Sequence, residues 1–151
     1  MIEAFSRAVV QKTEEARSFQ VRPLEEILIK ISSEQTNGKY SIMELRTGPD
    51  AGTPLHLHQR EDEIFEILEG RFRFSLDGDI VEATAGTTVL VPQNMPHWWR
   101  SVGEGSGRII LTFVPGGMEK LFEEVAAIPN DHLRIAQLAE QYGTVVLGPP
   151  L

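Results

Sequence analysis

The chain has 151 residues, no cysteine and a formal net charge of −8 at pH 7. This length is typical of one domain, and the lack of cysteine excludes disulfides and thiolate metal sites. The negative charge disfavours nucleic acid and anionic membranes as partners, because both are bound through lysine and arginine. No apolar run is long enough to span a membrane, and the N-terminus lacks the apolar block of a signal peptide. We therefore expect a cytoplasmic protein.

The first 26 residues carry two weak patterns. The stretch FSRAVVQK at 5–12 is typical of an edge strand, and TEEARSF at 13–19 is typical of a helical turn. Since neither pattern is long or strongly periodic, we treat 1–26 as an N-terminal arm.

Residues 27–115 are rich in short apolar strands separated by turn residues. Asn37-Gly38 and Asp77-Gly78 each predict a two-residue hairpin, since both central positions of a type I′ turn need positive φ. In RFRFSL at 71–76, aromatic and polar residues alternate, which predicts a strand with one buried face. Strands at this spacing predict an all-β sandwich or barrel.

The pattern changes to a helical one after residue 115, so 116–151 is predicted to be a helical appendage. One apolar face repeats at helical spacing through Met118, Leu121, Phe122 and Val125. A second helix is predicted to begin after Asn130 as its N-cap, with Ile135, Leu138, Ala139 and Tyr142 on one face, and to end at Gly143.

His56 and His58 are the first candidates for chemistry. Residues i and i+2 of a strand point to the same face, about 6.6–7 Å apart at Cα, so two imidazoles can reach one metal ion. An H-x-H pair alone is more often two polar residues on a solvated strand.

Four acidic residues follow the histidine pair. Glu63 opens the next strand and can supply an anionic oxygen at the entry of the strand adjacent to the pair. Glu61 has the same strand parity and is a rival ligand, whereas Asp62 and Glu66 have the opposite parity. We expect Glu66 to point into solvent.

His97 lies about a hairpin and a strand beyond Glu63, so only a closed sheet can bring it back to the pair. Read alone, it is a histidine bonded to a backbone carbonyl beside two tryptophans. The fourth histidine, His132, falls in the first turn of the predicted second helix, where we expect it on the surface.

Together these residues resemble the two motifs of the cupin superfamily, in particular small single-domain cupins of the Cupin_2 type. The first motif, G-x5-H-x-H-x3–4-E-x6-G, is matched by HLHQREDEIFEILEG from His56 to Gly70, a spacing that selects Glu63 over Glu61. Asp50 stands where the leading glycine is expected, between Gly48 and Gly52, which predicts a loop that is offset or differently shaped.

The second motif, G-x5-P-x-G-x2-H-x3-N, is matched from Gly86 through Pro92 to His97, with two departures. Asn94 replaces the turn glycine, and Ser101 replaces the final asparagine. Asparagine is the residue other than glycine that most readily enters the left-handed region, so the turn is expected to survive.

The resemblance implies a jelly-roll barrel, also called a double-stranded β-helix, over 27–115 with short C-terminal helices. It implies a metal held by His56, His58, Glu63 and His97, and a homodimer. Three imidazoles and a carboxylate suit a divalent transition ion such as Fe, Mn, Ni, Co, Cu or Zn rather than Mg²⁺ or Ca²⁺. By strand parity and proximity, Phe65, Met95 and Trp99 are candidates to line a small-molecule pocket.

The similarity to quercetinase-like cupins implies a dioxygenase of small phenolic or enolic compounds, with Glu63 acting as base. Two alternatives stay open. One is a non-redox isomerase, decarboxylase or lyase that uses the ion as a Lewis acid, and the other is a small-molecule-binding cupin without turnover.

Overall fold

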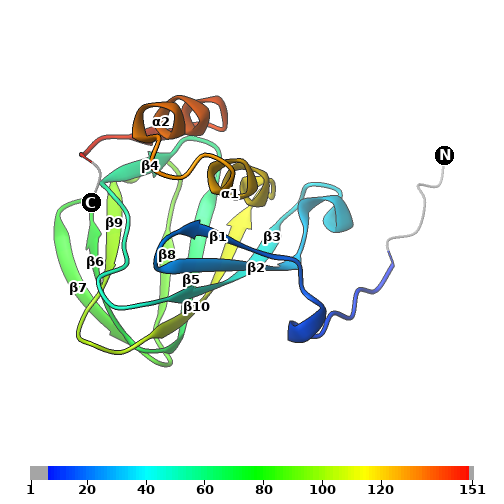
Figure 1. The fold of residues 1–151 in the computed structure, drawn as a ribbon, viewed down its shortest axis with the longest axis horizontal. Helices are drawn as coiled ribbons and strands as arrows, with labels where there is room; N and C mark the ends of the chain where they lie inside the picture. The colour runs from blue at the N-terminus through cyan, green and yellow to red at the C-terminus, as the bar shows by residue number, and fades with distance from the viewer. Residues whose placement is uncertain (1–6, 150–151) are drawn as a thin grey trace.

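The computed structural model describes residues 7–149, which form two antiparallel sheets packed face to face. The strand order is β1-β2-β3-β10-β5-β8 in the larger sheet and β11-β4-β9-β6-β7 in the smaller. Figure 1 shows the sheets curving around a common interior, with two short helices at one end. This is the predicted all-β jelly-roll barrel with C-terminal helices.

The elements have these bounds. The larger sheet comprises β1 (Ser18–Arg22), β2 (Glu25–Ile31), β3 (Ser41–Thr47), β10 (Gly107–Val114), β5 (Asp62–Glu69) and β8 (Thr88–Val91). The smaller sheet comprises β11 (Thr144–Val146), β4 (His56–His58), β9 (His97–Ser101), β6 (Arg71–Leu76) and β7 (Asp79–Thr84). The helices are α1 (Met118–Ala126) and α2 (His132–Gln141), with the short 3-10 turns η1 (Thr13–Glu15) and η2 (Ser33–Thr36).

The core lies between the two sheets and is built from alternate residues of their strands. Phe74 of β6, Phe65 of β5 and Phe113 of β10 have no exposed surface. The Phe65 and Phe74 rings meet edge to face, with centroids 5.0 Å apart, across the gap between the sheets. The alternation in RFRFSL therefore predicted the buried face of β6 correctly, because strand parity is set locally.

One of the two predicted two-residue hairpins is confirmed and the other is wrong. Asp77 and Gly78 join β6 to β7 with φ of 51° and 93°, as a type I′ turn requires. β2 and β3 do pair as a hairpin, but 32–40 connects them and contains η2. Asn37 has its predicted left-handed φ of 54°, yet it serves as the C-cap of η2. The capping box of Ser32 and Gln35 stabilises this turn, and the sequence interpretation had overlooked it.

The N-terminal interpretation needs a partial correction. The helical turn is confirmed only at its start, as η1, because Ser18 and Phe19 at its end belong to β1. The predicted edge strand is wrong for residues 7–12, which have no regular structure, and its positions 5 and 6 lie outside the described residues. The edge of the larger sheet is instead β1, whose partner is β2. The sheet thus begins inside the segment that the sequence set apart as an arm.

The helical appendage follows the predicted periodicity and adds a strand that was not predicted. Met118, Leu121 and Val125 of α1 are buried. The N-cap of α2 is Asp131 rather than Asn130, because Asn130 adopts a left-handed φ of 68° and the Asp131 side chain accepts from the Arg134 N–H. After α2 the chain returns as β11, which pairs with β4.

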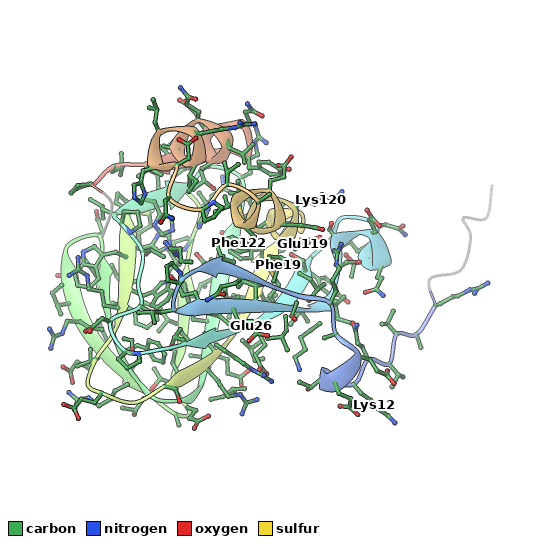
Figure 2. All side chains as sticks on the ribbon, viewed as in Figure 1. Lys12, Phe19, Glu26, Glu119, Lys120 and Phe122 are labelled. Carbon is green, nitrogen blue, oxygen red and sulfur yellow. The ribbon has the colours of Figure 1, made fainter. Side chains whose placement is uncertain are left out.

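The helices close one end of the barrel. α1 contacts β1, and the partly buried Phe19 and Phe122 from these two elements pack against the core (Figure 2). Glu119, also labelled there, is buried and accepts hydrogen bonds from the backbone N–H groups of Ser33 and Gly117, which ties α1 to η2. Within residues 7–149, neither helix has the length and apolar character needed to cross a membrane.

Candidate metal centre

The histidine pair points into the barrel. His56 and His58 are both buried, whereas Leu57 between them is only partly so. Their ring centroids lie 4.9 Å apart. The interpretation of this pair as solvated surface residues is therefore wrong.

His97 lies on the strand next to the histidine pair in the same sheet. β9 lies beside β4, and His97 is the direct cross-strand partner of His56. Their ring centroids are 4.2 Å apart, and that of His58 lies 5.4 Å from that of His97. The exposed fractions of His56, His58 and His97 are 8%, 5% and 1%, so all three imidazoles are shielded from bulk water.

Glu63 comes from the opposite sheet. The expectation that its strand is adjacent to the histidine pair is wrong, because β5 lies in the larger sheet and β4 in the smaller. The parity argument still holds, and the buried Glu63 carboxylate faces across the interior. Its Oε2 lies 3.1 Å from Nε2 of His58 and 3.1 Å from Nε2 of His97.

The four side chains form one compact cluster. Each of His56, His58, Glu63 and His97 offers one ligand atom, and these atoms all lie within 4.8 Å of one another. The cluster therefore joins strands of both sheets at a point that could hold a single ion.

The outer nitrogen of each imidazole is already bonded. His56 Nδ1 lies 2.8 Å from the Pro54 carbonyl, and His97 Nδ1 lies 2.9 Å from the Met95 carbonyl. A carbonyl only accepts, so both Nδ1 atoms carry the hydrogen and both Nε2 atoms present a lone pair in the neutral ring.

His58 is oriented by a residue that the sequence analysis did not name. Its Nδ1 lies 2.9 Å from Oγ1 of Thr144 in β11, and that hydroxyl also lies 3.9 Å from Sδ of Met118. Donation of the Thr144 hydrogen to the sulfur leaves the oxygen free to accept from His58. No signal in the sequence marks Thr144, since it stands in an ordinary apolar strand 86 residues from His58.

The electrostatics of the cluster separate its members. Burial lowers the pKa of His56 to about 3, helped by the nearby charges of His97 and His58, so that ring stays neutral. Burial acts in the same direction on His97, but the hydrogen bond and charge of Glu63 outweigh it and raise the pKa. Burial would raise the pKa of Glu63, yet hydrogen bonds from His58 and His97 lower it, which keeps the carboxylate ionised.

The residues present fit a divalent transition ion. Nε2 of His58 and Nε2 of His97 each meet the ionised Glu63 carboxylate at 3.1 Å, so this point favours positive charge, whether from imidazole hydrogens or from a metal ion. A metal ion would take the place of those hydrogens, while the outer acceptors fix each ring's tautomer as metal-ligating histidines require. Three nitrogens and one oxygen match a first-row transition ion better than Mg²⁺ or Ca²⁺.

The expected pocket residues lie in different surroundings. The Phe65 ring is fully buried, with its centroid 6.4 Å from that of His97. Trp99 is buried against Phe72, at a centroid separation of 5.9 Å. Met95 is partly buried and its carbonyl binds His97. Phe65 and Met95 therefore adjoin the cluster, whereas Trp99 packs as core.

The rival carboxylates are also placed. Glu66 is exposed, as expected from its parity. Asp62 accepts a hydrogen bond from the Gln93 N–H. Glu61 lies outside the four-residue cluster but is 6% exposed, and its Oε1 has no hydrogen-bond partner among the described residues. Burial raises the pKa of Glu61, against the charges of His58 and Arg60.

The motif departures are accommodated by the backbone. Asn94 adopts a left-handed φ of 68°, and its N–H donates to the His58 carbonyl at 2.7 Å. Asp50, which stands where the leading motif glycine is expected, adopts a left-handed φ of 63°.

A surface hollow of about 760 Å³ lies apart from the cluster. Its walls include Trp98 and Arg100, which have the opposite strand parity to His97, and Leu147 from the chain after β11. None of the four clustered side chains lines it.

Comparison with known proteins agrees with this geometry. Residues 43–113, from β3 to β10, match the family model Cupin_2, described as "Cupin domain". This chain contains a cupin domain. The four clustered side chains all fall within the matched residues of the cupin.

Three curated relatives are similar over part of their length. An uncharacterised protein of Methanocaldococcus jannaschii is 32% identical over 77 residues, which is 51% of this chain and 62% of that protein. The polyketide synthase CurC of Streptomyces cyaneus is 26% identical over 92 residues, 61% of this chain and 58% of that protein. Quercetin 2,3-dioxygenase of Bacillus subtilis is 25% identical over 104 residues, 69% of this chain and 30% of that protein. The cupin thus spans less than two thirds of each of these relatives.

Solved structures share the fold. KdgF from Halomonas sp. has a TM-score of 0.68 and 18% identity, covering 76% of this chain and 99% of that one. A predicted oxalate decarboxylase from Thermotoga maritima has a TM-score of 0.66 and 20% identity, covering 71% and 99%. The polyketide cyclase RemF from Streptomyces resistomycificus has a TM-score of 0.61 and 18% identity, covering 72% and 80%. At these identities the likeness concerns the fold.

Proposed function

We propose that this cupin binds one divalent transition ion through His56, His58, Glu63 and His97. The observation that carries the proposal is the set of four buried ligand atoms within 4.8 Å of one another. The hydrogen bonds on the outer nitrogens support it, because they leave the three Nε2 atoms available to an ion.

The reaction that we propose is dioxygen-dependent cleavage of a small phenolic or enolic compound. A bound ion of iron, manganese, nickel, cobalt or copper would supply the Lewis acidity and redox capacity for such chemistry. The similarity to quercetin 2,3-dioxygenase over 69% of this chain supports this choice, as does the apolar wall that Phe65 places beside His97.

Within this reaction we assign Glu63 the role of base. The hydroxyl O–H bond of the substrate breaks, its proton passes to a Glu63 oxygen, and the electron pair stays on the substrate oxygen. The partners of Glu63 favour its ionised form, so the carboxylate carries no proton when the substrate binds. The buried imidazoles of His56 and His97 keep their Nδ1 hydrogens on backbone carbonyls.

A second candidate is non-redox chemistry at the same ion, as in an isomerase, decarboxylase or lyase. The 26% identity with a protein named as a polyketide synthase favours this alternative. An ion at this site would polarise a substrate carbonyl while the oxidation state of the ion stays unchanged.

Elemental analysis followed by an anaerobic comparison tests both candidates. The purified protein is loaded with iron, nickel or manganese, and oxygen uptake is measured with a flavonol or a catechol. Uptake that depends on the metal supports the dioxygenase, whereas turnover that persists without oxygen supports the non-redox alternative. A protein that binds no metal after loading would refute both.

We also infer that the protein forms a homodimer. The resemblance to small single-domain cupins, which are commonly dimers, supports this inference. Analytical ultracentrifugation distinguishes a dimer of this chain from a monomer.

A further inference from the structure

Glu61 is a buried carboxyl group that the four-ligand cluster does not use. It precedes β5 and continues that strand's alternation, in which Glu61, Glu63 and Phe65 are buried and the residues between them are less so. Only 6% of Glu61 is exposed, and Oε1 is without a hydrogen-bond partner among residues 7–149. Buried polar atoms nearly always form a hydrogen bond, so we expect a hydrogen-bond donor to Glu61 Oε1.

The position of Glu61 indicates where that partner comes from. Residues i and i+2 of a strand share a face, with Cα atoms about 6.6–7 Å apart. Glu61 is therefore the inward-facing residue that precedes Glu63 along the chain. The Oε2 atom of Glu63 contacts His58 and His97.

A ligand with two adjacent oxygens could place one oxygen at the metal centre of the proposed function and direct the other toward Glu61. A hydroxyl at the second position donates to Oε1 and satisfies it. A carboxylate there has no hydrogen to donate, and it places a further negative charge beside Glu61 and Glu63.

We propose that Glu61 selects the substrate by accepting a hydrogen bond from a hydroxyl adjacent to the metal-binding oxygen. The substrate class is then a catechol, an enediol or a hydroxyketone rather than a dicarboxylate such as oxalate. The inference rests on the proposed metal centre and narrows its substrates. Glu61 is a specificity-determining residue in this account and not a metal ligand.

The experiment measures binding to the zinc-loaded protein by calorimetry, because zinc has no redox chemistry that would consume the probes. The probes are catechol, its monomethyl ether guaiacol, which lacks the second hydroxyl, and oxalate. The variants are Glu61→Leu, which removes the acceptor, and Glu61→Gln, which keeps one acceptor oxygen and adds a donor. Glu66→Leu is the matched control, since Glu66 is an exposed residue of β5.

The expected result is a loss of catechol affinity of about 10-fold or more in Glu61→Leu, the effect of one hydrogen bond to a charged group. Guaiacol should bind this variant as it binds the unmodified protein. Glu61→Gln should recover part of the catechol affinity and bind oxalate more tightly, because its amide donates to a carboxylate. Glu66→Leu should match the unmodified protein for all three probes.

Zinc content separates the possible failures. Equal affinity losses for catechol and guaiacol in Glu61→Leu, or no loss for either, would overturn the role of Glu61 while leaving the metal centre intact. Loss of zinc from both Glu61 variants would show that Glu61 is a ligand and would also overturn it. An unmodified protein that binds no zinc or other transition ion would refute the proposed function and this inference together.

Discussion

Replacing Thr144 by valine isolates the effect of one hydrogen bond on the metal centre. Thr144 Oγ1 lies 2.9 Å from His58 Nδ1, and both residues are 5% exposed, so water cannot easily replace the hydroxyl. Valine has nearly the same shape as threonine, which leaves the packing of β11 against β4 intact. The substitution therefore removes an acceptor without opening a cavity.

The expected effect falls on metal affinity rather than on the fold. In the metal-free Thr144→Val protein, His58 can move its hydrogen to Nε2 and donate to Glu63 Oε2 at 3.1 Å. A metal ion needs that lone pair, so binding returns the hydrogen to Nδ1, where it is buried without an acceptor. Such a group costs about 1–3 kcal/mol, equivalent to a loss of about 5–150-fold in affinity. Loss of an outer partner of a metal-ligating histidine typically costs about 10–100-fold.

Competition with a chromophoric chelator for Co²⁺ or Zn²⁺ measures this loss directly. Thr144→Ser keeps the hydroxyl and should bind the ion nearly as well as the unmodified protein. Thermal unfolding of the metal-free proteins should differ little between the two variants. Unchanged metal affinity in Thr144→Val, or equal weakening in Thr144→Ser, would refute the orienting role of this hydroxyl.

Three further predictions test the site and the barrel. His58→Ala should lose its stoichiometric metal, as measured by elemental analysis, whereas His132→Ala, at an exposed position of α2, should retain it. Full metal content in His58→Ala would show that the ligands are misassigned. Gly107→Ala should strongly lower the melting temperature, because a Cβ there would lie 2.3 Å from Cζ of Phe72; an unchanged melting curve would contradict this close packing. Burial opposes ionisation of Glu44, but hydrogen bonds from arginines hold its pKa at about 2, below its ordinary value of 4.5. This carboxylate therefore stabilises the fold above about pH 4.5, and the effect is lost as pH falls toward 2. In urea unfolding, Glu44→Gln should be less stable than the unmodified protein at pH 7 by about 1–3 kcal/mol and should converge with it in acid. A stability difference that does not depend on pH would contradict this role of Glu44.

The sequence by itself determined those features that depend on neighbours along the chain. The parity of His56 with His58, and of Glu63 with Phe65, follows from the two-residue repeat of a strand. The left-handed turn at Asp77-Gly78 follows from the residues that occupy it. These local rules identified the histidine pair but left Glu61 and Glu63 as rivals, and the spacing of the cupin motifs then selected the four residues that the structure brings within 4.8 Å of one another.

Only the tertiary structure decided which strands lie side by side. It placed Glu63 in the sheet opposite the histidine pair, made His97 the cross-strand partner of His56, and returned β11 so that Thr144 meets His58. It also left one oxygen of Glu61 buried without a hydrogen-bond partner among residues 7–149. Sheet order depends on how the two apolar faces close around a common core, and that closure joins residues far apart in the chain, which no local pattern records.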